Sequence, residues 1–199
     1  MTKIYDRAYY DRWYRDPRHR VRTRADLERT VRCVLGIAEH LLGRPVRSVL
    51  DVGCGEGRWQ PVLQRLRPGS RYAGLDTSEY AVARWGRRRN IRLGGFDALD
   101  EAGLDEAYDL VVCADVLHYL PTRALRRGLA ALPAYVGGVA YLETYAADDG
   151  IVGDLAGFQR RRSATYLRLF REAGLVPLAL HCYVTAEGAD ELTTLERPA

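Results

Sequence analysis

Three glycines alternate in the segment DVGCGEG, which spans residues 51–57. A strand that runs into such a turn lets its backbone pass close to a ligand, because glycine has no Cβ atom to stand in the way. A dinucleotide-binding fingerprint that starts at Gly53 would need another glycine at position 58, but the chain has Arg58 there. The spacing therefore disfavours a nicotinamide dinucleotide. The acidic residue Asp51 lies two positions before the first glycine.

Two more acidic residues follow the next two expected strands. Asp76 ends the strand expected at 71–76, where a carboxylate can accept hydrogen bonds from both hydroxyls of a ribose. Asp97 follows the strand expected at 91–96. Its carboxylate is placed either to accept a hydrogen bond from the exocyclic amine of adenine or to act as a loop or cap aspartate.

The elements that must position these residues alternate between strand and helix patterns. Apolar residues recur at helical spacing over 25–42, and we expect this helix to begin near Thr23 and to end at Gly43. The strongest signal for a buried strand is YDLVVCA at 108–114. Such alternation predicts an α/β fold with a parallel, doubly wound sheet and right-handed crossovers.

The end of the chain departs from this alternation. Two final strands are expected at 175–184 and 191–197, with a short turn around Gly188 between them. A parallel crossover needs a dozen or more residues, so these strands must pair antiparallel. The sequence therefore predicts a mostly parallel sheet that ends in an antiparallel hairpin.

Taken together, the motifs resemble the class I S-adenosylmethionine (SAM)-dependent methyltransferase family. The resemblance covers about residues 45–197 and follows the family's order, through VLDVGCGEG at 49–57, GLDTS at 74–78, FD at 96–97 and YDLVVCADVLHYL at 108–120. It implies a Rossmann-like, seven-stranded sheet and a methyl transfer that converts SAM to S-adenosylhomocysteine. We expect one compact chain, in which residues 45–199 bind SAM and residues 1–44 form an aromatic arm and a covering helix.

The resemblance also assigns parts of the cofactor to individual residues. It implies that Gly53 and Gly55 back the methionine part and that Asp76 binds the ribose. Ala114 and Asp115 would then lie beside the sulfonium. The expected cofactor contacts within the motifs are Asp51, Gly53, Cys54, Gly55, Asp76, Thr77, Asp97, Ala98 and Ala114.

Candidate catalytic groups follow the fourth and fifth strands, since ligands of open α/β sheets bind beyond the carboxyl ends of the strands. Asp115 is one of them. His118 titrates in the range that suits a general base, although a histidine in VLHYL can also simply pack beneath the next helix. Glu143 shares one strand face with Tyr141 and Tyr145, as an amine-binding or basic carboxylate or as a buried acid paired to an arginine or a tyrosine.

Aromatic residues crowd the first segment of the chain. Tyr9, Tyr10, Trp13 and Tyr14 resemble the Y-x-x-x-Y-Y arm that folds over SAM in many small-molecule methyltransferases. We expect Tyr9 and Tyr14 to contact the cofactor, where aromatic faces stabilise a sulfonium and exclude water. The alternative is a helix that packs its rings on the sheet.

Composition excludes several other classes of protein. The 199 residues contain no apolar run long enough to span a bilayer, and the N-terminus has no secretory signal, so we expect a cytoplasmic monomer or homodimer. The four cysteines are scattered without a C-x-x-C pair, which predicts neither a metal site nor a disulfide framework. Arginine clusters give a net charge of +4, but nearby acids balance them and argue against a nucleic-acid partner.

The predicted function is SAM-dependent methyl transfer to a small organic acceptor, in secondary metabolism. Three alternatives stay open at this point: an enzyme that cyclises or otherwise consumes SAM without methylating, an RNA methyltransferase, and a non-enzymatic partner subunit. A nicotinamide oxidoreductase is disfavoured by Arg58.

Overall fold

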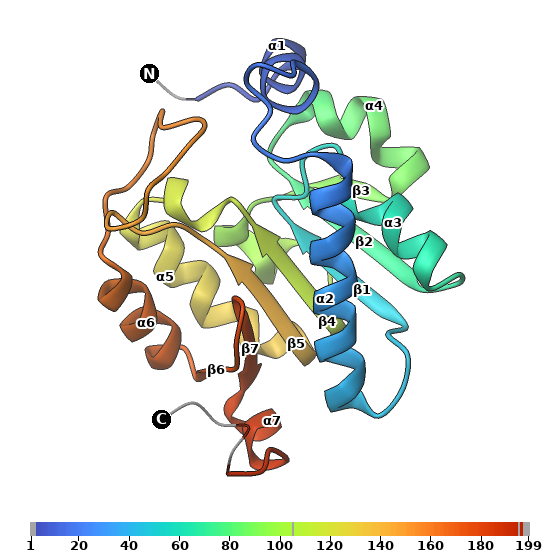
Figure 1. Ribbon diagram of the computed structural model, residues 1–199, viewed down its shortest axis with the longest axis vertical. Coiled ribbons are helices and arrows are strands. Elements are labelled where there is room, and N and C mark those ends of the chain that lie inside the picture. The colour runs from blue at the N-terminus through green and yellow to red at the C-terminus, as the bar shows by residue number, and fades with distance from the viewer. Residues whose placement is uncertain (1–2, 105, 195, 197–199) are drawn as a thin grey trace.

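A seven-stranded sheet forms the centre of the protein (Figure 1). The computed structural model describes residues 3–104, 106–194 and 196. The strands lie in the order β3-β2-β1-β4-β5-β7-β6. Their bounds are β1 Ser48–Val52, β2 Arg71–Asp76, β3 Ile91–Leu93, β4 Tyr108–Ala114, β5 Val136–Glu143, β6 Leu175–Pro177 and β7 Cys182–Thr185.

Strands β1 to β5 are parallel, and β7 pairs antiparallel with both β5 and β6. This arrangement confirms the predicted doubly wound sheet with an antiparallel hairpin at its end. Strand β1 lies between β2 and β4, so the chain order reverses at this point. Ligands of open α/β sheets bind at such a switch point, outside the carboxyl ends of the strands.

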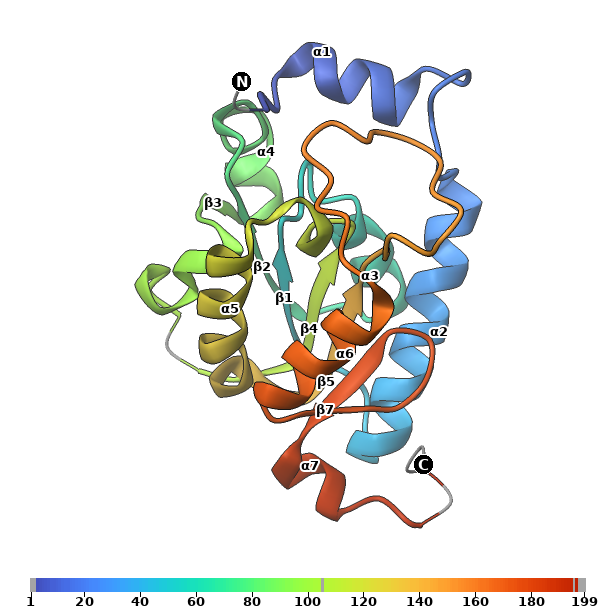
Figure 2. The same ribbon diagram turned by 90° about the vertical axis from the view of Figure 1, so that its left-hand side faces the viewer.

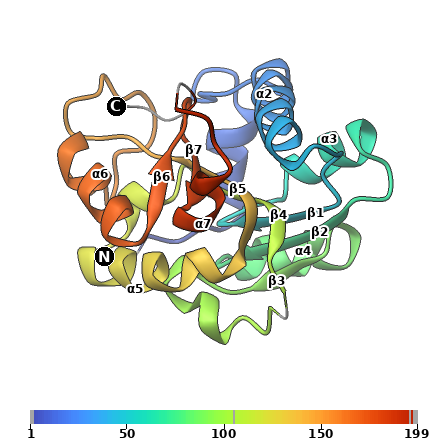
Figure 3. The ribbon, with the colours of Figure 1, turned by 90° about the horizontal axis from the view of Figure 1, so that it is seen from below.

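Apolar residues cover both faces of the sheet, because the side chains of a strand point alternately to opposite faces. Val49 of β1 packs with residues of α2 and α3, whereas Leu50 packs with residues of α5 and α6. Figure 3 shows the sheet edge-on between these layers. The α-helices are α1 Arg7–Tyr10, α2 Arg24–Leu42, α3 Trp59–Leu66, α4 Glu79–Arg89, α5 Thr122–Ala131, α6 Ser163–Glu172 and α7 Ala186–Asp190.

The ends of α2 are set by the residues that the sequence indicates. The Thr23 hydroxyl accepts a hydrogen bond from the backbone N–H of Asp26, whose carboxylate in turn accepts one from the backbone N–H of Thr23. Gly43 ends the helix in the left-handed conformation, with φ +62°. Both expected boundaries are therefore confirmed.

Two segments lie over the carboxyl ends of the parallel strands (Figure 2). The first is the N-terminal arm, residues 3–22, which contains α1 and a short π-helix at Asp11–Arg15. The second is the post-β5 loop, residues 144–162, between β5 and α6. No helix in the described part of the chain is long and apolar enough to cross a membrane.

The expected positions of the last two strands are wrong, although their antiparallel pairing is right. The segment 175–184 is broken between β6 and β7, and Leu180 and His181 adopt positive φ values there. The hairpin therefore forms within this one segment. The region around Gly188 is the helix α7, which the Thr185 hydroxyl caps, and the described residues beyond it form no strand. Residues 195 and 197 of the second expected strand lie outside the described residues.

Candidate active site

The glycine turn, residues 53–57, leaves β1 with backbone angles that favour glycine. Gly53 and Gly55 have φ values of +71° and +55°. The backbone N–H groups of Gly53 and Cys54 both donate to the carbonyl of Leu75 in β2, at 2.7 and 3.0 Å. A Cβ atom on Gly53 would stand 2.3 Å from Cγ2 of Val116, which is far inside van der Waals contact. The turn is thus held against the sheet at a position where only glycine fits without rearrangement.

Asp51 is buried at the end of β1, with 2% of its surface exposed. The hydroxyl of Tyr72 donates to its Oδ2 at 2.7 Å. Burial raises the pKa of Asp51 to about 7, against the lowering effect of the Tyr72 hydrogen bond. The carboxylate lines a cavity beyond the strand ends. A cation bound there would favour its charged form.

Asp76 is fixed at the end of β2 by backbone donors. Its Oδ2 accepts from the N–H of Gly55 at 2.6 Å, and its Oδ1 accepts from the N–H of Ser78 at 2.8 Å. Burial nevertheless raises its pKa. Each carboxylate oxygen can accept a further hydrogen bond, and Asp76 lines the cavity together with Thr77.

The cavity has two chambers that meet at shared walls. The Asp76 chamber contains Asp76, Thr77 and Asp97, and the Arg58 chamber contains Asp51, Cys54 and Arg58. Ala98 is not among the residues that line either chamber. The residues that line both chambers are Tyr9, Tyr14, Gly53, Ala114, Asp115 and Tyr119. The structure therefore brings all the expected cofactor residues except Ala98 to one continuous site.

The N-terminal arm contributes aromatic rings to this site. Tyr9 and Tyr14 face both chambers, while Tyr10 is buried and stacks on Tyr80 of α4 with ring centroids 5.6 Å apart. The arm thus lines the cavity with two of its rings and packs a third against α4 rather than against the sheet. The Ser78 hydroxyl donates to the backbone carbonyl of Tyr5 at 2.5 Å.

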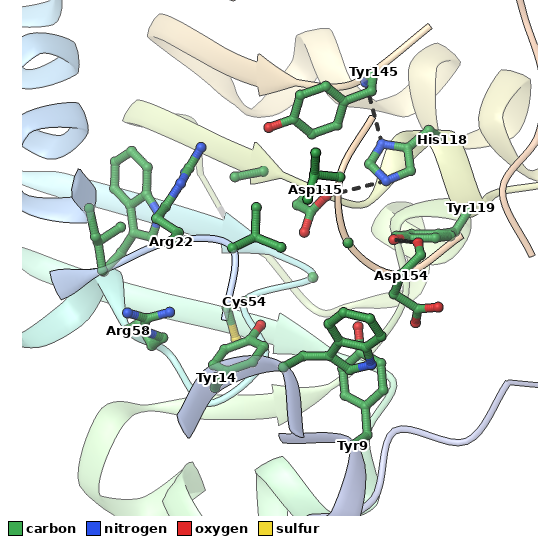
Figure 4. Close-up of a pocket in the computed structure, with 18 of the residues that line it drawn as sticks. Tyr9, Tyr14, Arg22, Cys54, Arg58, Asp115, His118, Tyr119, Tyr145 and Asp154 are labelled. Carbon is green, nitrogen blue, oxygen red and sulfur yellow. Dashed lines mark hydrogen bonds and ion pairs between the residues drawn. The ribbon is translucent and has the colours of Figure 1, made fainter. Parts of the chain in front are cut away.

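Asp115 and His118 form a pair at the junction of the chambers (Figure 4). His118 is 1% exposed, and its Nε2 lies 3.3 Å from Oδ1 of Asp115. Its Nδ1 accepts from the backbone N–H of Tyr145 at 3.4 Å, so the proton on the ring belongs on Nε2, facing the carboxylate. Asp115 has a φ of +63°, a conformation that aspartate tolerates better than most residues, and its side chain is 66% exposed.

Glu143 occupies a different environment from the other two catalytic candidates. Both of its carboxylate oxygens are paired with the guanidinium of Arg22, with Nη1 to Oε2 at 2.9 Å and Nη2 to Oε1. The Tyr145 hydroxyl also donates to Oε1, at 3.3 Å. Burial by itself lowers the pKa of Arg22, but the hydrogen bonds and the negative charge of Glu143 outweigh this effect, so the pKa of Arg22 is raised. Arg22 lines the Arg58 chamber and Glu143 does not, so Glu143 supports this wall from behind.

Several lining residues were missed at the sequence level. Arg22, Trp59 and Asp154 all face the Arg58 chamber, and Arg58 had been used only to disfavour a dinucleotide. Asp154 belongs to the post-β5 loop, where the sequence has no strong pattern. For Arg58, a signal was present: a charged residue directly after a ligand-binding turn. Among the described residues, no group of three or more His, Cys, Asp or Glu side chains is placed to hold a metal ion.

Comparison with solved structures places the fold among methyltransferases. CalS10 of Micromonospora echinaspora, an amino pentose methyltransferase solved with bound SAM, is 20% identical with a TM-score of 0.64, over 88% of this chain and 91% of that one. Magnesium protoporphyrin IX methyltransferase of Synechocystis PCC 6803 is 20% identical with a TM-score of 0.60, over 88% and 84%.

A third similar structure is a complex of the Haloferax volcanii Trm112 methyltransferase activator with a putative methyltransferase, at 24% identity and a TM-score of 0.52, over 76% of this chain and 72% of that one. No curated protein matches the chain. The methyltransferase domain family matches residues 9–192, which is nearly the whole chain. The chain therefore belongs to the methyltransferase domain family, and the resemblance to class I SAM-dependent enzymes is confirmed.

Proposed function

We propose that the protein transfers the methyl group of SAM to a small organic acceptor. The observation that carries this proposal is one cavity in which three carboxylates, a glycine turn and an Asp–His pair meet at the switch point of the sheet. Asp51 and Asp76 end adjacent strands, and the Asp115–His118 pair follows β4. We place the reaction in the cytoplasm, with secondary metabolism as its setting.

The residues present fit this cofactor. The Asp76 chamber offers the carboxylates of Asp76 and Asp97 for the ribose and adenine, and Gly53 and Gly55 of the glycine turn line it as well. The aromatic faces of Tyr9 and Tyr14 suit a sulfonium, which attracts the negative faces of aromatic rings. SAM supplies the reaction with an electrophilic methyl group on this sulfonium.

Asp115 is the group best placed to accept a proton from the acceptor. It lines both chambers, so it lies where cofactor and acceptor would meet. His118 acts through Asp115 as a positioning residue, because its Nε2–H faces the carboxylate while Nδ1 is held by the Tyr145 backbone. The third candidate, Glu143, holds the guanidinium of Arg22 in the chamber wall.

The acceptor is expected to be small. Residues 1–44 would act as a cover, because the N-terminal arm contributes a wall to the Arg58 chamber. Residues 45–199 would act as the binding domain, whose post-β5 loop contributes another wall. The methyl acceptors named for similar structures differ widely, from an amino pentose to a magnesium porphyrin. The chamber of this chain, and not its fold, therefore has to select the acceptor.

Parallel calorimetric titration with SAM, S-adenosylhomocysteine and NADH tests the cofactor assignment. We expect micromolar binding of the two adenosyl ligands and a loss of affinity in Asp76→Ala. Binding of NADH alone would overturn the proposal. Product analysis after incubation with candidate acceptors then tests the reaction, because methyl transfer yields S-adenosylhomocysteine, whereas cyclisation of SAM yields methylthioadenosine.

Removal of the arm tests the cover. A chain that lacks residues 1–20 should stay folded but bind SAM more weakly, since Tyr9 and Tyr14 are lost from both chambers. Unchanged affinity in a folded truncated protein would contradict the covering role.

A further inference from the structure

Aromatic rings line the Arg58 chamber, and the polar tips of two of them are engaged by the protein. The Tyr145 hydroxyl donates to Glu143 at 3.3 Å, and the Tyr119 hydroxyl donates to the backbone carbonyl of Asp154 at 2.6 Å. Trp13 of the N-terminal arm lines this chamber and not the Asp76 chamber, as Tyr145 does. Rings held in this way offer a ligand their apolar bodies rather than their hydroxyls.

Two of these rings lie around the Asp115–His118 pair (Figure 4). The ring centroid of His118 is 4.2 Å from that of Tyr119 and 5.5 Å from that of Tyr145. Asp115, the base in the proposed reaction, lies 3.3 Å from His118 and therefore has aromatic neighbours. An acceptor whose reacting atom meets Asp115 has to place its body against these rings.

Two of the charged groups in the chamber wall are neutralised from behind. Both carboxylate oxygens of Glu143 pair with Arg22, and Lys3 lies 2.7 Å from the carboxylate of Asp154. Neither Glu143 nor Lys3 lines the chamber, so each pair presents a balanced charge to a ligand. An acceptor with a net charge would bury that charge without a partner on this wall, which is costly.

The other charged groups of the wall have different tasks. Asp51 and Arg58 flank the glycine turn, which lies on the side of the cofactor in the proposed function. Asp115 is left for the acceptor. A carboxylate is a weak base, and it takes a proton more readily from a phenol, whose pKa is about 10, than from the less acidic aliphatic alcohols. An ammonium acceptor would be held in its protonated form by Asp115, and in that form its nitrogen has no lone pair for a methyl group.

We infer that the methyl acceptor is an uncharged phenol, which lies against Trp13 and Tyr145 with its hydroxyl at Asp115. The inference rests on the proposed function and names the substrate class of the same site. The phenol oxygen forms a bond to the methyl carbon while the carbon–sulfur bond breaks, and the electron pair of that bond stays on the sulfur. The phenol proton passes to Asp115 and from there to water, so the products are an aryl methyl ether and S-adenosylhomocysteine.

Four probes of similar size test this inference, by calorimetry on the protein saturated with S-adenosylhomocysteine. They are phenol itself, the aliphatic alcohol cyclohexanol, the cation benzylamine and the anion benzoate. We expect phenol to bind at least about tenfold more tightly than each of the others, because it makes two aromatic contacts and has no charge to desolvate. With SAM in place of S-adenosylhomocysteine, phenol should yield its methyl ether, anisole, which gas chromatography detects.

Two variants test where the phenol lies. Trp13→Leu and Tyr145→Leu should each weaken phenol by about three- to tenfold, the range for one aromatic contact, and should leave cyclohexanol and S-adenosylhomocysteine within about twofold. Trp85→Leu is the matched control, because this tryptophan of α4 lines neither chamber. We expect both alcohols to bind to it as they bind to the unmodified protein, and a loss equal to that of Trp13→Leu would overturn the inference.

The contrary outcomes are distinguishable. Equal losses of phenol and cyclohexanol in both leucine variants of the chamber would mean that the rings only maintain its shape. Cyclohexanol, benzylamine or benzoate bound as tightly as phenol, no binding of any probe, or no anisole from bound phenol would also overturn the inference. All of these results leave the cofactor assignment standing. If the unmodified protein does not bind S-adenosylhomocysteine, the proposed function itself fails.

Discussion

The two chambers of the cavity are held in place by different kinds of contact. Around the Asp76 chamber, backbone groups do the positioning: Gly53, which lines both chambers, donates to Leu75, and Gly55 and Ser78 donate to Asp76. Around the Arg58 chamber, side chains distant in sequence do it, such as Arg22 with Glu143, 121 positions apart. The carboxylate side of the first chamber therefore forms when β1 and β2 pair, whereas the second also needs the post-β5 loop to dock. The arm contributes Tyr9 and Tyr14 to both chambers.

This difference separates the binding of the cofactor from the selection of the acceptor. Backbone contacts within a paired strand unit persist for as long as the sheet does, and they suit a cofactor that every catalytic cycle requires. Segments held by a few side-chain pairs open at a lower cost in free energy than the sheet, so they suit the entry and release of ligands. Asp115 lies at the junction between the chambers, where the cofactor and the acceptor must both be in place for the reaction.

Asp115→Asn should have the largest effect, because it removes the proposed base at this junction. Asparagine keeps the shape and tolerates the positive φ of +63°. With an acceptor found by screening, we expect kcat to fall by about 10²- to 10⁴-fold, the range for general base catalysis, with the affinity for S-adenosylhomocysteine little changed. Steady-state kinetics and calorimetry measure the two effects.

His118→Gln sharpens the same result. Because His118 is a positioning residue, His118→Gln should lower kcat less than Asp115→Asn does. It should also shift the pH dependence of kcat without a matching fall in Tm. A normal kcat in Asp115→Asn would refute the role of Asp115. A loss in His118→Gln that tracks Tm alone would reduce His118 to a packing residue.

Gly53→Ala tests the glycine turn, which the backbone contacts hold against the sheet. The new Cβ would stand 2.3 Å from Val116, and the residue would keep a φ of +71°. We expect S-adenosylhomocysteine to bind about 100-fold more weakly, because clash and strain together amount to a few kcal/mol. Gly69→Ala is the control for strain alone, since its φ is +81° and nothing lies within 4 Å of the added Cβ. Equal affinities in the two variants would contradict the clash.

The backbone-built half of the site was largely predictable from the sequence. Alternating glycines and acids at the ends of expected strands locate Gly53, Asp51 and Asp76, because the parallel sheet brings consecutive strand ends together. The side-chain-built half was not. Nothing near Arg22 in the sequence points to Glu143, and their pairing depends on how the arm crosses the sheet.

The predicted positions of the last two strands are wrong for a local reason. The pattern of residues 175–184 predicts one apolar strand, but Leu180 and His181 adopt positive φ values there. Residues other than glycine rarely adopt such values, and neither leucine nor histidine indicates them in a sequence. Arg58 was visible in the sequence, but only the folded structure shows that no carboxylate among the described residues is paired with it. That kind of information exists only after the other arginines have been paired.

The pH dependence of binding should report on Asp51. Burial raises its pKa to about 7 in the folded protein, above the value of 3.8 for an exposed aspartate, so the folded state binds the proton more tightly than the unfolded state. Its contribution to stability is therefore present at low pH and is lost as the pH rises towards 7. S-adenosylhomocysteine carries an ammonium group, and Asp51 is an expected cofactor contact that lines the cavity. Bound beside Asp51, this ammonium favours the charged carboxylate, so binding should release a proton below pH 7.

Affinity should then rise by up to about tenfold per pH unit between pH 5 and 7, the limit for one proton, and should level off above. Calorimetry in two buffers of different ionisation enthalpy counts the released proton. Asp51→Asn is the control, since it abolishes the slope that Asp51 causes. The same slope in both proteins would exclude Asp51 as its source.

The smallest effect is expected where the arm meets the post-β5 loop. Lys3, the only lysine of the chain, lies 2.7 Å from Asp154 and 3.6 Å from the ring centroid of Tyr119. Lys3→Met should weaken S-adenosylhomocysteine by only about two- to fivefold, mostly through faster dissociation, because Lys3 lines neither chamber and acts only by holding the arm on the post-β5 loop.

A double-mutant cycle isolates this contact, because Lys3→Met together with Asp154→Asn should cost no more than either change alone if the pair is the link. Arg7→Ala serves as the control on the same arm: its pair with Asp11 is exposed, with 80% of the Arg7 side chain accessible, and joins no other segment. Stopped-flow dissociation rates compare the four proteins. Fully additive losses would show that the arm and the loop close independently, and the Arg58 chamber would then be held by Arg22 and Glu143 rather than by a joint between its two covers.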